Sequence, residues 1–224
     1  MSAINSILIT RKPGSFEKLE QWCVSQHIRL NQVPFIKVEA VLNVAIPVSD
    51  WIFLSSPQGA QHYLKHYVIK AKNIAALGQG TAAVLKKTRL QVAFIGEPTD
   101  DPVIIGQKFN ALINSNSTVF FPLGNRSKRS VIDQIHSDQV IEQITYKTSD
   151  QQQVLSEKFD TILFTSPSNF HSFIQSNVID SNTCIIAMGK TTEKAIRDFD
   201  STLDVSVLAS PTESALIAFL EKLK

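Results

Sequence analysis

The sequence has few cysteines and no long apolar run. Its two cysteines, Cys23 and Cys184, are too few for a disulfide framework and suit a reducing compartment, where we expect buried thiols. The longest mainly apolar stretch, residues 40–48, contains Asn43 and Pro47 and is too short to cross a bilayer as a helix. These two absences exclude a disulfide-stapled secreted domain and a helical membrane protein.

The sequence also has almost no excess of one charge. Its 22 lysines and arginines face 20 aspartates and glutamates, which gives a net charge of +2 without a basic block, so duplex binding is disfavoured. Residues 1–5 show no positive region ahead of a hydrophobic run, so we expect no secretory signal. Because 43% of the residues are hydrophobic, the chain can build real cores, and we expect a globular cytoplasmic protein.

Short apolar runs alternate with helical patterns along the whole chain, and a first helix is expected after Ser15 as its N-cap. The runs that predict buried strands are residues 7–9, 51–54, 74–77, 92–95, 119–121, 161–164, 184–188 and 205–208. The runs in the first half are each expected to lead through a polar turn into a helix. This alternation predicts an α/β fold with parallel sheets covered on both faces.

Two segments interrupt this alternation. Residues 33–41 and 141–148 have the pattern of extended strands without a helix to cover both faces. The polar stretch 148–159 then suits a surface connector. We interpret the two extended segments as the crossings between two domains.

The strongest internal signal is a repeat. Residues 50–57 (DWIFLSSP) match residues 160–167 (DTILFTSP) without a gap, and residues 76–81 (ALGQGT) match residues 187–192 (AMGKTT). The two blocks keep the same order and nearly the same separation, so we favour a duplication over chance similarity of two strand ends.

The repeated turns could bind an anion. Each Ser-Pro pair, at Ser56 and Ser166, places an N-cap before a proline at the first helical position, and each Gly-x-x-Thr turn leads from a strand into a helix. Free N–H groups collect at such helix starts, at the edge where open α/β sheets bind ligands. Two domains with two such turns each could therefore line a cleft, although the serines and threonines could also merely cap their helices.

One turn also fits a dinucleotide-binding pattern. Residues 78–83 read G-x-G-x-x-A after an expected strand, and Glu97 lies near the distance of a ribose-binding acid. The second copy of the turn has Thr191 where the second glycine should admit pyrophosphate, which weighs against a nicotinamide site.

Two polar clusters could be ligand-binding sites or ordinary solvated surface groups. His62 and His66 would share a helix face, as metal ligands can, but Lys65 stands where a zinc protease motif needs a nearby glutamate, and a solvated pair is the better interpretation. The basic residues within 126–129 could hold ligand carboxylates or lie at a solvated helix start.

Taken in order, these motifs resemble those of the uroporphyrinogen-III synthase family. The shared segments are residues 9–11 (ITR), 50–57, 77–82, 121–125 with Arg129, 144–146 (ITY), 160–168, 187–192 and 210–212 (SPT). They span nearly the whole chain, and their order carries the resemblance because no single motif is specific.

The resemblance implies two similar flavodoxin- or Rossmann-like α/β domains joined by a two-stranded β-ladder. Residues 1–35 would join 157–224 in a discontinuous domain, and residues 46–142 would form the inserted domain. Residues 36–45 and 143–156 would be the linker strands, which agrees with the crossings placed from the pattern alone.

The resemblance also implies a reaction. The family is a cofactor-free and metal-free hydro-lyase that closes hydroxymethylbilane, a linear tetrapyrrole with acetate and propionate side chains, into uroporphyrinogen III for haem and sirohaem biosynthesis. Water leaves the hydroxymethyl group, and ring D is inverted during closure. A monomer without nucleic-acid or membrane partners is expected.

Site residues follow from the same alignment. Tyr146 matches a tyrosine proposed to assist departure of the hydroxyl group, and its alternative role is aromatic packing on the linker ladder. The expected substrate-binding residues are Ser56, Gln79, Thr81, Ser166, Ser168, Lys190 and Thr192. We expect most of the binding to use backbone amides, so no single side chain should be indispensable.

Two other classes of function stay open on the residues alone. One is an NAD-dependent oxidoreductase that uses the turn at residues 78–80. The other is a non-enzymatic two-domain anion-binding protein, hinged like a solute receptor.

Overall fold

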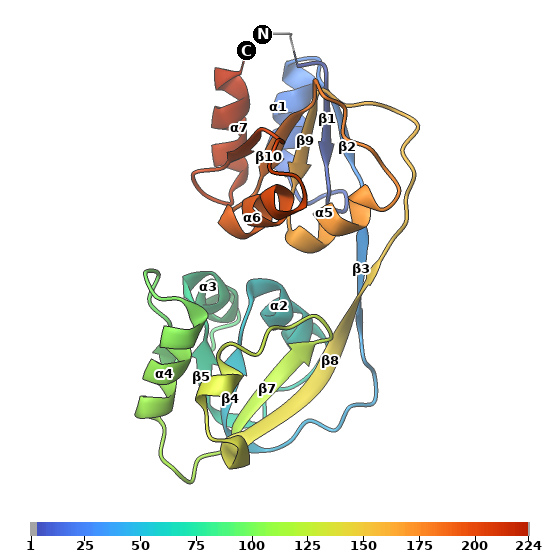
Figure 1. The fold of residues 1–224 in the computed structure, drawn as a ribbon. Coiled ribbons are helices and arrows are strands. Elements are labelled where there is room, and N and C mark those ends of the chain that lie inside the picture. The colour runs from blue at the N-terminus through green and yellow to red at the C-terminus, as the bar shows by residue number, and fades with distance from the viewer. Residues whose placement is uncertain (1–3, 224) are drawn as a thin grey trace. The chain divides into compact units, whose positions relative to one another are not determined.

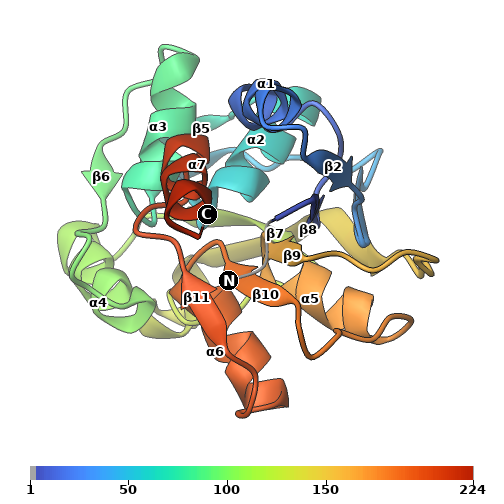
Figure 2. The same cartoon turned by 90° about the horizontal axis from the view of Figure 1, so that it is seen from above.

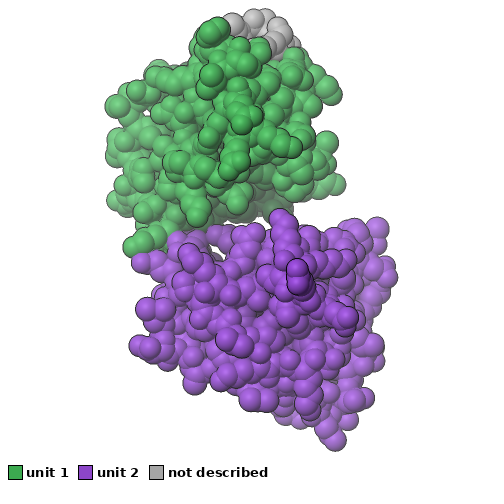
Figure 3. All heavy atoms as spheres, turned by 180° about the vertical axis from the view of Figure 1, so that it is seen from behind, with its two compact units in different colours: residues 1–37, 149–224 green, residues 38–148 purple. Residues whose placement is uncertain are grey.

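The computed structural model describes residues 4–223 as two compact units, drawn in Figures 1 and 3. Unit 1 combines residues 1–37 with residues 149–224, and unit 2 is residues 38–148. The chain therefore passes between the units at Lys37 and again at Thr148. The expectation of no secretory signal concerns residues that lie partly outside the described part, and the linker boundaries at 36–45 and 143–156 stay a prediction.

Unit 1 is built on a five-stranded sheet in which all strand pairs are parallel. The spatial order is β11-β10-β9-β1-β2, so two strands from the start of the chain complete a sheet begun near residue 161. The strands are β1 (Ser6–Ile9), β2 (Arg29–Gln32), β9 (Thr161–Phe164), β10 (Cys184–Ala187) and β11 (Val205–Val207).

Helices cover both faces of this sheet, as Figure 2 shows. The helices α1 (Glu17–Ser25) and α7 (Glu213–Lys222) lie on one face, and α5 (Pro167–Ile174) and α6 (Lys190–Phe199) lie on the other. Successive side chains of a strand point to opposite faces. Ile7 and Ile9 accordingly pack in the core under α1 and α7, whereas Leu8 packs in the core under α5 and α6.

Unit 2 has a six-stranded sheet with the order β3-β8-β7-β4-β5-β6. The pairs from β8 to β6 are parallel, and β3 is the edge strand beside β8. The strands are β3 (Ile36–Ala40), β4 (Ser49–Leu54), β5 (Ala71–Ala76), β6 (Phe94–Ile95), β7 (Val119–Gly124) and β8 (Val140–Asp150).

The two faces of this sheet are covered in the same way. The helices α2 (Pro57–His66) and α3 (Gln79–Lys87) pack over Ile52 and Leu54, while α4 (Pro102–Leu112) and the 3₁₀ turn η1 (Ile132–Gln134) pack over Phe53. A second 3₁₀ turn, η2 (Ser137–Gln139), leads into β8. Each unit therefore has its own two-sided hydrophobic core.

The structure repeats the same succession of elements in both units. The series β4-α2-β5-α3-β6-α4 corresponds to β9-α5-β10-α6-β11-α7, and β7 and β8 take the places of β1 and β2. When the strands are numbered from β4 and from β9, five strands of each sheet have the order 3-2-1-4-5. Unit 1 is circularly permuted, and β3 is an additional edge strand in the sheet of unit 2. The predicted α/β class with two similar parallel-sheet domains is confirmed.

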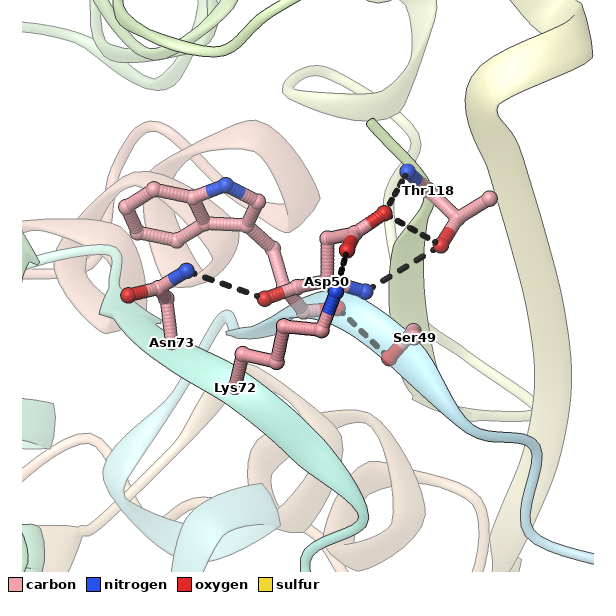
Figure 4. Close-up of polar contacts among 6 residues, drawn as sticks. Ser49, Asp50, Lys72, Asn73 and Thr118 are labelled. Carbon is pink, nitrogen blue, oxygen red and sulfur yellow. Dashed lines mark hydrogen bonds and ion pairs between the residues drawn. The ribbon is translucent and has the colours of Figure 1, made fainter. Parts of the chain in front are cut away.

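The duplication extends to a polar clasp formed by the first residue of each repeat, and Figure 4 shows the copy at Asp50. Asp50, at the start of β4, accepts hydrogen bonds from Thr118 N (3.0 Å) and Thr118 Oγ1 (3.1 Å), just before β7. Asp160, just before β9, accepts from Ser6 N (2.9 Å) and Ser6 Oγ (3.0 Å) at the start of β1. Each carboxylate ties the amino ends of two adjacent central strands.

These clasps hold their carboxylates in the ionised form. Lys72, 2.8 Å from Asp50, together with Thr118, lowers the pKa of Asp50 to about 2. Hydrogen bonds from the Asn5 amide and from Ser6 lower the pKa of Asp160. Both clasps lie at the amino ends of the strands, opposite the edge that binds ligands in such sheets, so we assign them to stability.

Three local expectations differ from the structure. Phe16, not Ser15, is the N-cap of α1, and no side chain caps that helix. The polar edge strand β2 carries one apolar residue in four and gave no strand signal. After β7 the chain forms 3₁₀ turns instead of a helix, because Ile132 and Ile135 pack on the core from a single short turn. No helix in residues 4–223 is long and apolar enough to cross a membrane.

Candidate functional site

The Ser-Pro turns cap their helices, as predicted. Ser56 is the N-cap of α2 and its Oγ accepts the N–H of Gly59 at 3.0 Å. Ser166 is the N-cap of α5 and accepts the N–H of Asn169 at 3.2 Å. A proline follows each serine at the first helical position, where its fixed φ suits the helix.

This capping leaves the Ser-Pro turns with little capacity for an anion. Proline has no N–H, and the serine side chain and carbonyl accept the third and fourth amides of the helix. In the first turn of each helix, one N–H group has no hydrogen-bond acceptor within residues 4–223. It is the N–H of Gln58 in α2 and the N–H of Ser168 in α5. Each Ser-Pro turn therefore offers one backbone donor, fewer than a helix start without proline and without a capping side chain would offer.

The Gly-x-x-Thr turn of unit 2 offers two free backbone N–H groups in the described chain, one more than a Ser-Pro turn. Gly78 is the N-cap of α3 and has no side chain to occupy the first amides. The N–H groups of Gln79 and Gly80 have no acceptor among the described residues, whereas the N–H of Thr81 bonds to the Gly78 carbonyl at 3.1 Å. Thr81 is only 3% exposed. Two adjacent donors at the positive end of a helix favour an anionic ligand.

The corresponding turn of unit 1 has the same geometry. Gly189 is the N-cap of α6, and the N–H of Thr192 bonds to its carbonyl at 3.0 Å. Lys190 and Thr191 provide the two amides without an acceptor in the described chain, and Thr192 is 2% exposed. Because Lys190 is exposed, this turn also carries a positive charge that the turn of unit 2 lacks.

Unit 2 has a cavity of ≈ 310 Å³ at the carboxyl ends of β4, β5 and β6. It is lined by Ser55, Pro57, Leu77, Gly78, Gly80, Thr81, Glu97, Pro98, Asp100, Pro102 and Ile105. Pro57 Cγ lies 3.3 Å from the position that a Cβ would take on Gly80, so the starts of α2 and α3 touch at this cavity. The predicted residue Thr81 faces it.

Two carboxylates distinguish this cavity from the second copy of the turn. Lys108 lies 3.4 Å from Glu97 and 2.7 Å from Asp100 and partly balances them. Gly96 donates its N–H to the carbonyl of the last residue of β5, and Leu208 donates to the carbonyl of the last residue of β10, so these two residues are equivalent in the two units. The residues that follow them, Glu97 and Ala209, are therefore also equivalent. The two duplicated turns therefore have different electrostatic surroundings.

A β-bulge sets the direction of Tyr146. In the register of β7 and β8, Leu123 pairs with Ile144 but Gly124 pairs with Tyr146, so Thr145 is an extra residue on β8. A bulge of this kind re-aims the next side chain. The hydroxyl of Tyr67 donates to the Thr145 carbonyl at 2.9 Å and fixes the bulge from α2's side of the sheet.

The re-aimed Tyr146 ring lies against two glycines and a histidine. A Cβ on Gly124 would come within 2.4 Å of the ring, and a Cβ on Gly59 would lie 3.3 Å from the phenol oxygen. The ring of His62 lies 5.5 Å away, centroid to centroid, at an interplanar angle of 32°. The same Gly59 Cβ position is 2.9 Å from Ser56 Oγ, so the phenol lies over the first turn of α2.

The expectation of a solvated histidine pair is wrong for His62. It is half-buried between Tyr146 and the exposed His66, whose ring lies 4.9 Å from it. Burial, followed by repulsion from His66, lowers the pKa of His62, so this imidazole is neutral at neutral pH. No group of three potential metal-binding side chains occurs within residues 4–223.

One residue of the basic cluster that follows β7 in sequence forms ion pairs. Arg129 pairs with Glu142 and, at 3.1 Å, with Asp133. It lies in the irregular segment before η1, so the alternative of a helix start does not apply.

The predicted site residues lie at the carboxyl edge of the sheet of their own unit. In unit 2 the structure brings Ser56 and Tyr146 together at one glycine and places Thr81 at the adjoining cavity, while Gln79 is exposed beside it. In unit 1, Ser166, Ser168, Lys190 and Thr192 lie in the first turns of the adjacent helices α5 and α6.

Several neighbours of these residues escaped the sequence analysis. Gly59 and Asp100 belong to none of the motifs, and Gly124 lies in the shared segment 121–125 without a predicted role of its own. Glu97 was noted only as a ribose-binding acid. Their importance depends on contacts between segments far apart in the chain.

The sequence matches the model of a known protein family. A profile described as uroporphyrinogen-III synthase HemD matches residues 28–218, which is most of the chain. The chain belongs to the uroporphyrinogen-III synthase family. The resemblance seen in the ordered motifs is thereby confirmed.

Solved structures of uroporphyrinogen-III synthases have the same fold. The enzyme of Helicobacter pylori is 15% identical and matches with a TM-score of 0.68 over 99% of this chain and 100% of its own. A mutant enzyme of Thermus thermophilus is 12% identical, with a TM-score of 0.64 over 98% of both chains. No curated protein sequence matches the chain significantly.

Uroporphyrinogen-III synthases are cyclising hydro-lyases of tetrapyrrole biosynthesis that act on hydroxymethylbilane, and this chain is an enzyme of that kind. Nothing favours the alternatives of an NAD-dependent oxidoreductase or a non-enzymatic binding protein. In unit 2 the strand order reverses between the parallel strands β4 and β7, where a dinucleotide would be expected, but the turn at Gly78 follows β5.

Proposed function

We propose that Tyr146 and the two Gly-x-x-Thr turns are the parts of this chain that carry out the uroporphyrinogen-III synthase reaction. The observation that carries the proposal is the position of the Tyr146 phenol, which lies over the first turn of α2. This turn follows β4, and the strand order of the sheet reverses between β4 and β7. Ligands of open α/β sheets bind at this kind of point.

In the proposed first step, Tyr146 acts as a general acid. The bond from carbon to the hydroxymethyl oxygen breaks while the phenol proton moves to that oxygen, and water leaves. The lone pair of the nitrogen of the same pyrrole ring forms the new double bond, which gives the protonated azafulvene, a cation that keeps its N–H proton and balances the charge of the phenolate. The phenolate that remains faces the positive end of α2, which stabilises negative charge, until solvent returns the proton.

The carboxylates of the substrate would be held mainly by backbone donors. The amide pairs Gln79–Gly80 and Lys190–Thr191 supply two N–H groups each, and Lys190 adds a charge. Thr81 and Thr192 would support the turns from the buried side, and Ser56, Ser166 and Ser168 would shape the helix starts.

We also propose that the enzyme acts as a monomer in the cytoplasm, without cofactor or metal. Two free cysteines and a net charge of +2 are in keeping with this proposal. β3 and β8, which include the two crossings at Lys37 and Thr148, would serve as the linker strands.

One assay tests the activity. Hydroxymethylbilane is supplied to the purified protein, and the oxidised products are separated by chromatography. We expect isomer III well above the isomer I that forms spontaneously. A product mixture identical to the uncatalysed control would reject the assignment.

The role of Tyr146 is tested in the same assay. We expect Tyr146→Phe to lower kcat by at least about tenfold with little change in KM, because general acid catalysis typically contributes about 10²- to 10⁴-fold and solvent can replace part of it. Tyr63→Phe is the matched control, since that hydroxyl donates to the Val68 carbonyl away from the phenol of Tyr146. Equal kcat for Tyr146→Phe and the wild type would assign Tyr146 to packing.

A further inference from the structure

Three residues from two elements surround the ring of Tyr146, and we call them the tyrosine seat: Gly59 and His62 on α2 and Gly124 at the end of β7. We infer that the tyrosine seat fixes the phenol for the dehydration step and that His62 is a positioning residue acting through Tyr146. This inference rests on the proposed role of Tyr146 as the general acid.

The two glycines provide space that no other residue would leave. A Cβ on Gly124 would fall 2.4 Å from Cε2, 2.5 Å from Cζ and 2.8 Å from the hydroxyl oxygen of Tyr146. A Cβ on Gly59 would lie 3.3 Å from that oxygen and 2.9 Å from Ser56 Oγ. Any side chain at Gly124 would therefore push the ring out of its place, and one at Gly59 would crowd the oxygen.

His62 closes the remaining side by stacking. The centroid of its ring lies 5.5 Å from that of Tyr146 and 4.9 Å from that of His66. The Tyr146 ring on β8 therefore extends the row of the two histidine rings on α2. The Nδ1 atom of His62 is buried and has no hydrogen-bond partner in the described chain. The planes of the His62 and Tyr146 rings are inclined by 32°, so the imidazole presents its face to Tyr146, and such a contact can orient a ring but cannot pass a proton to it.

The backbone that carries Tyr146 is fixed independently of His62. Asn125 Oδ1 accepts the N–H of Thr148 at 2.8 Å and Asn125 Nδ2 donates to the Thr148 carbonyl at 3.1 Å. The bulge residue Thr145 is held by the hydroxyl of Tyr67. With the backbone held on both sides, the freedom left to the phenol is rotation of its side chain, which the tyrosine seat restricts.

The stack separates positioning from chemistry in a testable way. A residue that positions by ring contact can be replaced by phenylalanine, which keeps the ring and loses both nitrogens. A residue that relays a proton cannot. His62→Phe and His62→Ala therefore distinguish the two roles, and His66→Ala is the matched control because its ring contacts His62 and not Tyr146.

The direct readout is fluorine NMR of full-length protein labelled with 3-fluorotyrosine. The chain has three tyrosines, so the spectrum holds three signals, and Tyr146→Phe assigns one of them. We expect His62→Ala and Gly124→Ala to shift or broaden the Tyr146 signal while the signals of Tyr63 and Tyr67 stay in place. His62→Phe should leave all three signals near their wild-type positions, and His66→Ala should leave the Tyr146 signal in place, whereas the ring of Tyr67 lies 6.4 Å from His66 and its signal is not part of this control.

The isomer assay supplies the second readout. We expect His62→Ala and Gly124→Ala to lower kcat by about tenfold, because misplacing a reacting group by about 1 Å can cost up to about 10²-fold. KM should change little, since the carboxylate-binding turns are untouched. His62→Phe should restore kcat to within about twofold of the wild type.

The outcomes separate the inference from the proposal on which it rests. The inference is overturned if His62→Phe is as slow as His62→Ala, if neither alanine variant moves the Tyr146 signal, or if the signal moves while kcat does not. Failure of the wild type to form isomer III would instead reject the proposed function. The fluorine signals would still report whether the tyrosine seat holds the ring.

Discussion

At the scale of single residues, His62 shows how packing changes the state of a group. Burial and the neighbouring His66 lower its pKa below 6.5, so folding favours the neutral imidazole. The stability from this preference is complete above pH 6.5 and is lost as the pH falls through the lower pKa of the folded protein. The neutral state suits a ring that stacks on Tyr146.

Proton NMR of the histidine Cε1–H signals checks this state. We expect His62 to titrate below pH 6.5, and we expect its pKa to rise in His66→Ala because a repelling charge is removed. The signal of His62 is assigned from its loss in His62→Phe. A titration at or above pH 6.5 in the wild type would contradict the buried stack.

Tyr67 is a second residue whose environment is informative, because its contribution to stability depends on its hydroxyl group. Its hydroxyl lies between the carbonyls of Val41 and Thr145 and can donate to either, and burial raises the pKa of its phenol. Tyr67→Phe should lower the free energy of unfolding by about 1 kcal/mol, as expected for one lost hydrogen bond. Urea unfolding measures the change, and Tyr146→Phe, whose hydroxyl lies over the first turn of α2, should leave the free energy of unfolding nearly unaffected.

At the scale of elements, the duplicated helix starts have diverged in charge. The turn before α6 carries Lys190, whereas the cavity beside the turn before α3 carries Glu97 and Asp100. If the substrate is a polyanion bound at both turns, these charges have opposite effects on binding. The shared backbone geometry then supplies affinity, and the side chains tune it.

Paired charge-removing variants test this divergence. We expect Lys190→Gln to raise KM and Glu97→Gln to lower it, each by about two- to fivefold at low salt, since exposed charges contribute about 0.2 to 1 kcal/mol. Both effects should shrink as salt increases, and kcat should stay nearly constant. Changes of the same sign in both variants would show that the cavity of unit 2 does not receive the acidic side chains.

The elements also show what the sequence could predict. The Ser-Pro and Gly-x-x-Thr signals placed the starts of α2, α5, α3 and α6 because capping is a local interaction over four residues. β2 and the 3₁₀ turns after β7 were missed because their backbone is fixed by pairing and packing with distant segments rather than by their own periodicity.

At the scale of the whole molecule, each unit has cores formed by its own residues. The two clusters of unit 2 draw only on residues between Ile46 and Ile141, and those of unit 1 only on residues outside 38–148. Unit 2 is continuous in sequence, whereas unit 1 needs both ends of the chain. Folding of unit 1 therefore requires contacts of long sequence separation.

A fragment of residues 38–148 tests this independence. We expect it to fold alone with a cooperative thermal transition and dispersed amide NMR signals, because its two-sided core and its clasp at Asp50 are complete. A fragment of residues 149–224 is the control and should stay unfolded, since it lacks β1, β2 and α1. A disordered 38–148 fragment would mean that the units depend on each other for stability.

The sequence by itself determined most of the alternation of strands and helices, the duplication and the family. All of these depend on local burial patterns, on capping within a few residues, or on the order of motifs along the chain. The tertiary structure decided which residues meet: the bulge at Thr145 turns Tyr146 onto Gly124, and α2 brings Gly59 and His62 against the same ring. Register between strands and contact between separate segments leave no periodic signal, because they arise only when the strands pair and the helices pack.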